Sequence, residues 1–523
     1  MRSPNPSLAA FLPLLGLCVL SACGGGNGEN PVAPPLTPER GELLANPPQL
    51  MGGYGTDILP GLIGANSVAG ALLTIGFTAT CGVNVYQLQY ETVGALGEYT
   101  TASGALMTPA GSAAGCSGPR PIVMYAHGTT PDETFNIADL SRSDNDEGLM
   151  IAALFASQGY IVVAPNYAGY DISTLGYHPY LVADQQSKDM IDALTAARTA
   201  LPATAAPAVS DNGQLFITGY SQGGFVALAT QRALEAAGQT VTAAAPMSGP
   251  YALAAFGDAL FDGEVTLSST ENITLLVNSY QHAYGNIYSQ PSDLFGPQYA
   301  PTIAGLLPST TSISSIYAQG LLPQNALFSS TPPAAQYASI TPATTPAELA
   351  PAFALGFGTG NLITNSYRLS YLQDAVTAPD GGYPTLTTGL PAAAPAEALR
   401  QALKTNDLRG FMPAAPVLLC AGSSDPTVLF LDTQLMQDYW SSHPPTLAPA
   451  VLDVDSPPTG NDPYAALKDG FAAAKAAVAG AAVAGGATDG GALAVLQDYH
   501  ATLVPPFCFG AAKSFSDAHS NGA

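Results

Sequence analysis

The order of hydrophobic and polar positions predicts strands that alternate with helices. Short apolar or alternating runs are typical of strands, and apolar residues at helical spacing mark the segments between them. Alternation of this kind predicts an α/β fold with a mostly parallel sheet and helices on both faces. The predicted strands are residues 83–93, 101–107, 121–126, 160–165, 215–218, 241–246 and 416–422, and the predicted helices are 148–158, 184–200 and 222–237.

The alternation breaks over residues 251–415, which are rich in Pro, Thr, Ser, Ala and Tyr and have weak periodicity. A poorly ordered loop is one interpretation. A cap or lid inserted into the sheet domain is favoured, because the segment has aromatic side chains to pack and loops this long are uncommon unless functional. We therefore predict a core in two parts, residues 51–250 and 416–523, with an Ala/Gly-rich insertion at about 456–491 that forms a helix followed by a turn.

Composition limits the possible partners. The 523 residues carry 14 Lys+Arg against 38 Asp+Glu, a net charge of −24, and such a surface repels the phosphates of nucleic acids. With 54 Gly and 45 Pro and no repeat period, a coiled coil or helical repeat array is excluded. The 47% of hydrophobic residues is ample for a packed core.

The N-terminus has the pattern of an export signal. Arg2 precedes an apolar stretch, residues 8–20, that is too short to span a bilayer, and Leu-Ser-Ala-Cys at 20–23 resembles a bacterial lipobox. We predict a signal peptide at 1–22, lipidation of Cys23 and a Gly/Pro-rich tether over 23–50. The expected location is the outer membrane or cell surface of a bacterium. An ordinary secretory signal that happens to end in Cys is the alternative.

Of the six cysteines, Cys18 leaves with the signal peptide and Cys23 takes the lipid, so four remain, and they can pair in three ways. We favour Cys81–Cys116 and Cys420–Cys508, because each pair should lie in one neighbourhood of the fold. Zinc ligation is the alternative, but no pair has the spacing of metal ligands. Disulfides agree with export to an oxidising compartment.

Ser221 is the predicted nucleophile. It lies in Gly-Tyr-Ser-Gln-Gly at 219–223, between an apolar strand and an alanine-rich helix. Gly-x-Ser-x-Gly is common by chance, but between a strand and a helix it is typical of a nucleophile elbow. The serine backbone is strained there, and the positions two residues away need to be almost free of side chains, which Gly219 and Gly223 satisfy.

A serine nucleophile needs a base, and the base needs an orienting acid. In proteins whose serine lies on such a strand-to-helix elbow, the acid follows the serine along the chain, and the histidine follows the acid. Asp425 comes directly after the predicted strand 416–422 and is the predicted acid, although an Asp before Pro can also be a turn former. Asp453 and Asp455 are the alternative acids.

Three histidines follow Asp425. His443 precedes two prolines and is expected to close a helix, and His519 lies in a polar tail near the end of the sequence. His500 has apolar neighbours and is the predicted base. A Cys420–Cys508 bridge would support it on what we expect to be a loop.

The oxyanion hole is predicted from two main-chain N–H groups, those of Thr129 and Gln222. Thr129 lies in the loop after the strand 121–126, and Gln222 follows the nucleophile. His127 precedes the serine in the chain, so we interpret it as structural. His178 is likewise interpreted as a packed loop residue.

Four segments together resemble the secretory lipase family, which consists of α/β-hydrolases with a large inserted cap. They are PIVMYAHGT at 121–129, GYIVVAPNYAGY at 159–170, HPYL at 178–181 and GYSQGG at 219–224. The resemblance extends over roughly residues 83–251 and the region of Asp425. It implies an α/β-hydrolase fold and lipase or esterase activity.

We therefore predict a serine carboxylic-ester hydrolase, an esterase or lipase, that works through an acyl-enzyme. Ser221 attacks the carbonyl, His500 carries the proton and Asp425 orients the imidazole. No metal or organic cofactor is predicted, and the partner is a small-molecule or lipid ester, with membrane contact through the N-terminal lipid.

Two alternatives differ in what they require. A peptidase or amidase of the same fold needs a site for a substrate terminus, which the sequence does not show. A non-catalytic binding lipoprotein predicts a missing triad residue, whereas candidates for all three are present in order.

Overall fold

The computed structural model describes residues 39–520 apart from 67, 75–77, 205–207 and 444–446. The predicted signal peptide, Cys23 and most of the predicted tether lie outside these residues. The N–H groups of Gly41 and Leu44 already donate to the carbonyl oxygens of Glu91 and Gln89, each at 2.8 Å. The chain thus joins the sheet before residue 50, and the predicted tether is too long at this end.

Nine strands of the described chain form one sheet in the order β1-β2-β3-β5-β4-β6-β7-β10-β11. The pairs from β1 to β5 are antiparallel, and those from β5 to β11 are parallel. This confirms the predicted α/β-hydrolase fold. The strands are β1 (Gln49–Tyr54), β2 (Gly82–Val93), β3 (Tyr99–Ala110), β4 (Gly118–Ala126), β5 (Ile161–Pro165), β6 (Val209–Tyr220), β7 (Ala243–Met247), β10 (Leu418–Ala421) and β11 (Ala450–Asp453).

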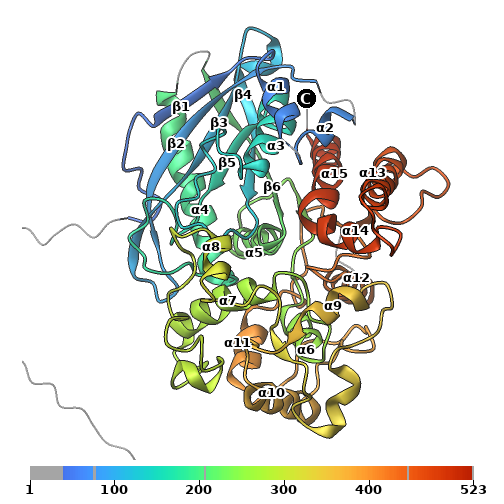
Figure 1. Cartoon of the computed structure of the whole chain (residues 1–523). Coiled ribbons are helices and arrows are strands. Elements are labelled where there is room, and N and C mark those ends of the chain that lie inside the picture. Colours follow the sequence, from blue (N-terminus) through green and yellow to red (C-terminus); the bar gives the residue numbers. More distant parts are fainter. Residues whose placement is uncertain (1–38, 67, 75–77, 205–207, 444–446, 521–523) are drawn as a thin grey trace, which may run out of the picture. The chain divides into compact units, whose positions relative to one another are not determined.

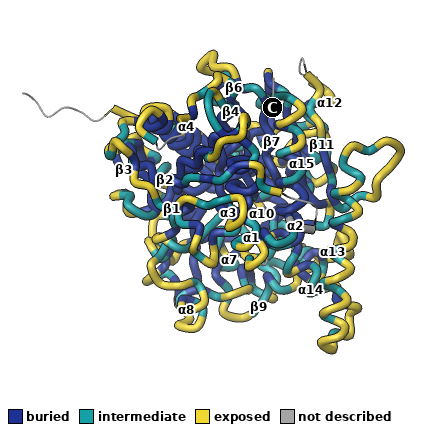
Figure 2. Tube along the Cα trace, turned by 90° about the horizontal axis from the view of Figure 1, so that it is seen from above, coloured by how far each residue is buried: buried dark blue, intermediate teal, exposed yellow. Residues whose placement is uncertain are grey.

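Helices cover both faces of the sheet (Figure 1). In β4, Ile122 and Met124 belong to the core on one face, and Val123 and Tyr125 to the core on the other, as the period of a strand requires. The interior between the layers is buried (Figure 2). The first face packs against α4 (Ala183–Ala200) and α5 (Gln222–Ala236), and the second against α1 (Leu59–Ala65), α2 (Ala71–Thr74), α3 (Asp146–Leu154) and α15 (Val504–His519).

Residues between β7 and β10 contain six α-helices, which lie beyond one end of the sheet (Figure 1). The hydrophobic pattern did not predict these helices, because several of them are short. In addition, eight of the nine residues of α6 are buried, so this helix has no polar face. The helices are α6 (Leu253–Phe261), α7 (Ser269–Tyr284), α8 (Ile313–Ala318), α9 (Ala350–Leu355), α10 (Asn365–Thr377) and α11 (Ala398–Asn406), and β8 (Phe328–Ser329) pairs with β9 (Phe357–Gly358).

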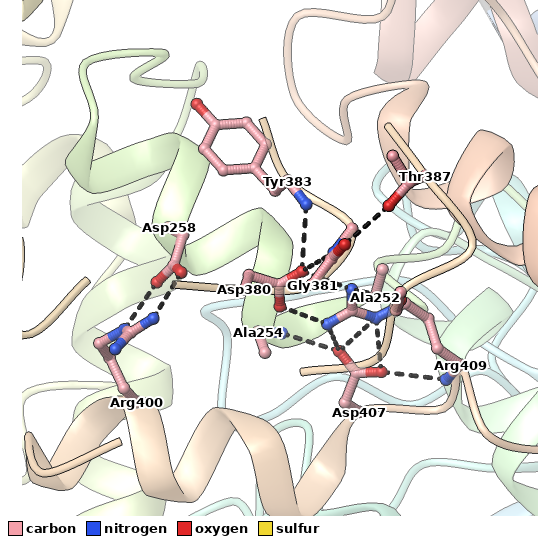
Figure 3. Close-up of polar contacts among 12 residues, drawn as sticks. Ala252, Ala254, Asp258, Asp380, Gly381, Tyr383, Thr387, Arg400, Asp407 and Arg409 are labelled. Carbon is pink, nitrogen blue, oxygen red and sulfur yellow. Dashed lines mark hydrogen bonds and ion pairs between the residues drawn. The ribbon is translucent and has the colours of Figure 1, made fainter. Parts of the chain in front are cut away.

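A buried ion network fixes α6 within this region (Figure 3). Arg400 of α11 donates to both carboxylate oxygens of Asp258 of α6, at 2.9 and 2.7 Å. Arg409, whose side chain is fully buried, donates to Asp380 at 2.8 and 2.7 Å and to Asp407. Burying a pair of charges is costly, so such pairs specify an arrangement more than they add net stability. The network holds α6 and α11 in a fixed position relative to each other.

The C-terminal part forms α12 (Leu431–Ser442), α13 (Ala465–Ala484), α14 (Ala492–Asp498), a π-helical turn (Tyr499–Leu503) and α15. The Ala/Gly-rich segment is a helix followed by a turn, as predicted. The expected loop around His500 is wrong, because His500 lies within the π-helical turn. Pro505 and Pro506, which follow this turn, do not break the helix. They occupy the first turn of α15, where a proline loses no helical hydrogen bond.

In the part of the chain that the structure describes, no helix is both long and apolar enough to cross a membrane.

Candidate functional site

Ser221 occupies a strained turn between β6 and α5. Its φ is 58° and its ψ is −121°, outside the regions that L-residues favour. A Cβ at Gly219 would lie 2.3 Å from the Gly223 carbonyl oxygen, and one at Gly223 would lie 1.9 Å from that of Ala126. No side chain fits at either position. The turn therefore needs both glycines, and it presents the serine at the N-terminus of α5.

The structure brings Ser221, His500 and Asp425 together in one chain of hydrogen bonds. His500 Nε2 lies 2.8 Å from Ser221 Oγ, and His500 Nδ1 lies 2.7 Å from Asp425 Oδ2. Only 1% of Asp425 is exposed. A proton on Nδ1 leaves Nε2 free to accept the serine proton, which is the arrangement of a Ser-His-Asp triad.

Asp425 and His500 are held from several sides. Asp425 Oδ1 accepts from the N–H groups of Thr427 and Val428 at 2.8 and 3.1 Å, which leaves Oδ2 for the imidazole. Tyr220 Oη donates to the carbonyl oxygen of His500 at 2.6 Å. These contacts fix the carboxylate of Asp425 and the backbone of His500 without help from a substrate.

Asp453 and Asp455, the alternative acids, brace the loop of Asp425. Asp453 Oδ1 accepts from the Ser423 N–H at 3.0 Å. Tyr499 Oη donates to Asp455 Oδ2 at 2.6 Å and accepts from the Ser424 N–H at 3.1 Å. Their contacts thus support the acid and base segments, and Asp425 is the carboxylate bonded to His500.

Both favoured disulfides are present. Cys81 is bonded to Cys116 near the start of β2, and Cys420 of β10 to Cys508 of α15. The second bond joins the strand before Asp425 to the helix after His500. Two disulfides indicate a protein that folds in an oxidising compartment, outside the cytoplasm. Among the described residues, no group of three or more His, Cys, Asp or Glu is arranged to hold a metal ion.

The two candidate oxyanion donors reach the surroundings of Ser221 from different elements. Gln222 is the first residue of α5, where helix geometry leaves the main-chain N–H without a partner in the helix. Thr129 lies in the loop after β4, and its hydroxyl is 2.8 Å from Tyr180 Oη. The N–H of Gly128, which lies between β4 and Thr129, already donates to the carboxylate of Glu147. It is therefore not free to bind the oxyanion.

His127 and His178 are buried next to these donors. Burial lowers the pKa of His127 to about 4 and that of His178 to about 3, so both are neutral at physiological pH. His127 Nδ1 is 2.7 Å from the Gly128 carbonyl oxygen. His178 Nε2 accepts from the Gln222 side chain at 2.8 Å. Both rings hold the surroundings of the site in place, in line with their structural interpretation.

Glu147 is the functional candidate that sequence reasoning missed. Its carboxylate accepts from the Gly128 N–H at 3.1 and 3.0 Å and from the Tyr125 hydroxyl. Burial, the largest influence, raises its pKa to about 7. In the sequence Glu147 resembles any acidic residue in the first turn of a helix, so no local signal marks it.

Two cavities meet at Ser221. A polar cleft of about 620 Å³ contains the His500 side of the site, and its walls include Thr129, Glu147, Glu271 and Thr310. An apolar cavity of about 60 Å³ starts at Ser221 and Gln222 on the other side. Its apolar walls come from α6, α7 and α11 and include Leu253, Phe256, Leu260, Ile273, Leu276 and Leu403.

The comparisons with known proteins fit this geometry. Residues 149–283, well under half of the chain, match the sequence profile of the prolyl oligopeptidase family. The match includes Ser221 and ends before Asp425 and His500. No curated protein sequence matched the chain.

Two solved structures share the fold over most of their length. The rice cell wall degrading esterase LipA from Xanthomonas oryzae is 27% identical, with a TM-score of 0.60 over 80% of this chain and 91% of LipA. A structure from Legionella pneumophila is 18% identical, with a TM-score of 0.62 over 92% of this chain and 99% of its own, and supports the fold alone.

Proposed function

We propose that this chain, an α/β-hydrolase of the lipase and esterase group, cleaves carboxylic esters through an acyl-enzyme. The observation that carries the proposal is the hydrogen-bonded chain of Ser221, His500 and Asp425 on a nucleophile elbow. The 27% identity to an esterase over most of both chains supports the choice of ester over amide.

The mechanism follows from which atoms can exchange protons. His500 Nε2 takes the proton of Ser221 Oγ as the oxygen attacks the ester carbonyl, and Asp425 stabilises the imidazolium that forms. The N–H groups of Gln222 and Thr129 bind the oxyanion of the tetrahedral intermediate. His500 then gives its proton to the leaving alcohol, and water, activated by the same imidazole, hydrolyses the acyl-serine.

We assign the two halves of the ester to the two cavities. The leaving alcohol has to receive a proton from His500, which lines the polar cleft. The alcohol therefore leaves through the cleft, and the acyl chain extends into the apolar cavity beside Gln222. Because the cavity is small, about 60 Å³, and the buried ion pair between α6 and α11 fixes part of its wall, we expect acyl chains of limited length to be preferred.

A peptidase is the second candidate, and the match to the prolyl oligopeptidase profile favours it. A panel of p-nitrophenyl esters of increasing chain length, assayed beside aminoacyl-anilides, separates the two. We expect turnover of the esters with an optimum in chain length. Hydrolysis of anilides without ester turnover would make the protein a peptidase, and turnover of neither would favour a binding protein.

We further propose that the protein is an exported lipoprotein anchored through Cys23. The two disulfides support export, and the lipobox-like Leu-Ser-Ala-Cys at 20–23 supports lipidation. Cys23→Ser should move the protein from the membrane fraction to the soluble fraction. Membrane fractionation and mass spectrometry of the N-terminal peptide measure this. A wild-type protein that is soluble, with an unmodified N-terminus beyond Cys23, contradicts the anchor.

A further inference from the structure

Glu147 connects the start of α3 to the loop of the candidate oxyanion hole. Both of its carboxylate oxygens accept from the single N–H of Gly128, and the Tyr125 hydroxyl donates to the same carboxylate. Glu147 also lines the polar cleft together with Ser221 and His500. It is therefore a carboxylate at the reaction site that the triad mechanism does not use.

Gly128 lies between this carboxylate and the nucleophile. A Cβ at Gly128 would be 2.7 Å from Glu147 Oε1 and 3.6 Å from Ser221 Cβ. The Gly128 backbone thus fits closely between the two side chains. Because the next N–H along the chain is that of Thr129, the orientation of the Gly128 peptide groups decides where that donor points.

We propose that Glu147 is a positioning residue, whose ionised carboxylate clamps the Gly128 N–H and so aims the Thr129 N–H at the oxyanion. The inference rests on the proposed function, since it assigns a role within the ester-hydrolysing site. Oxyanion donors act through their placement, and a displacement of about 1 Å can lower a rate roughly 100-fold.

The clamp depends on the ionisation state of Glu147. The ionised form accepts from both donors, whereas protonation converts one acceptor oxygen into a hydroxyl. Burial raises the pKa of Glu147 to about 7, so the clamp loosens as the pH falls below neutrality. Glu271 of α7 lines the same cleft. The groups facing Glu147 are Tyr125 of β4, Tyr220 of β6, Asp146 of α3, Tyr167 after β5 and His500.

The kinetic test compares Glu147→Ala with Glu147→Gln, which keeps an acceptor oxygen for Gly128. We expect Glu147→Ala to lower kcat about 30- to 100-fold with little change in KM, and Glu147→Gln to lower it several-fold. Formate added to Glu147→Ala should restore part of the rate, because the site opens on the cleft. In the wild type, kcat/KM should rise with pH through an ionisation near pH 7. The pH profile of Glu147→Gln should lack that ionisation.

Stability measurements separate this role from folding. Because its pKa is raised in the folded state, Glu147 favours folding most below its unfolded pKa, and that contribution is lost as the pH rises through about 7. The Tm of Glu147→Gln minus that of wild type should therefore be more positive at pH 8 than at pH 5. If Glu147→Gln is at least as stable as wild type at pH 8 and still has a lower kcat, unfolding cannot explain the lower kcat.

Asp146→Asn is the matched control. It removes one negative charge from the same turn of α3, where Asp146 contacts Asn66 rather than the Gly128 loop. Its kcat at pH 8 should stay within about twofold of wild type, because Glu147 is ionised there with or without the charge of Asp146. Unchanged kcat and an unchanged pH profile in both Glu147 variants, with ester turnover intact in the wild type, would overturn the clamp and leave the proposed function standing. Absence of ester turnover in the wild type would instead remove the proposed function.

Discussion

Ser221→Ala should lower kcat for ester hydrolysis by about 10⁴-fold or more and leave Tm nearly unchanged. Removing the nucleophile leaves only the residual catalysis of the oxyanion hole and substrate binding. The fold should tolerate the change, because the strain of the turn lies in the backbone and alanine keeps the Cβ. Ester assays and thermal denaturation measure the two effects. A fluorophosphonate should label the wild-type protein at Ser221 and leave the variant unlabelled.

Two further variants make this test specific. Ser210→Ala removes an exposed hydroxyl from the other end of the same strand, β6, and should keep wild-type activity and labelling. Asp425→Asn keeps the size of the acid but disfavours the tautomer that His500 needs, so kcat should fall by roughly 10⁴-fold. Labelling at a serine other than Ser221, or full activity in Ser221→Ala, would move the nucleophile elsewhere.

The parts of the fold that the sequence predicts well are those with local signals. The strands of the sheet are short apolar runs, and the elbow around Ser221 needs its glycines for steric reasons that act within a few residues. Asp425 could be proposed because it follows a recognisable buried strand. His500 was selected among the three histidines after Asp425 by its apolar neighbours and the nearby Cys508, and its helical surroundings were not predicted.

What the sequence could not predict depends on contacts between distant segments. The first half of β6 is polar, Ser-Asp-Asn-Gly-Gln at 210–214. Its residues 209–211 pair with Gly118–Arg120 of β4, and residues 212–214 lie at an irregularity in the pairing, so no apolar pattern marks this part of the strand. The buried helix α6 has no polar face to reveal its period. Glu147 gains its contact with Gly128 only when α3 packs beside β4, so its importance is invisible in a linear pattern.

Replacing Cys420 and Cys508 together by Ala should lower both Tm and kcat. The bond closes a loop of 88 residues, and in the chain-entropy model this constraint on the unfolded state is worth about 4–5 kcal/mol. Alanine is preferred to serine, because both sulfur atoms are buried and an unpartnered hydroxyl would add its own cost. Thermal denaturation and steady-state kinetics with the preferred ester measure the changes.

The effect on kcat follows from where the bond lies. Cys420 lies in β10, the strand that leads to Asp425, and Cys508 lies in the helix that continues from the turn of His500. The bond therefore fixes the distance between the segments of Asp425 and His500. Cys81 and Cys116 provide the matched control, because their bond closes a loop of 35 residues far along the chain from the triad. Their double Ala variant should lose a similar amount of stability, about 4 kcal/mol, and keep its kcat.

The contacts of Tyr220 and Tyr499 limit how far kcat should fall when the Cys420–Cys508 bond is removed. Tyr220 bonds the His500 carbonyl, and Tyr499 links Asp455 to the loop before Asp425, so the base keeps part of its support without the disulfide. We therefore expect kcat to fall by about tenfold, well short of the loss in Ser221→Ala, because the contacts hold the imidazole near its position. Equal kcat losses in the two double variants would show that the Cys420–Cys508 bond stabilises the fold without orienting His500.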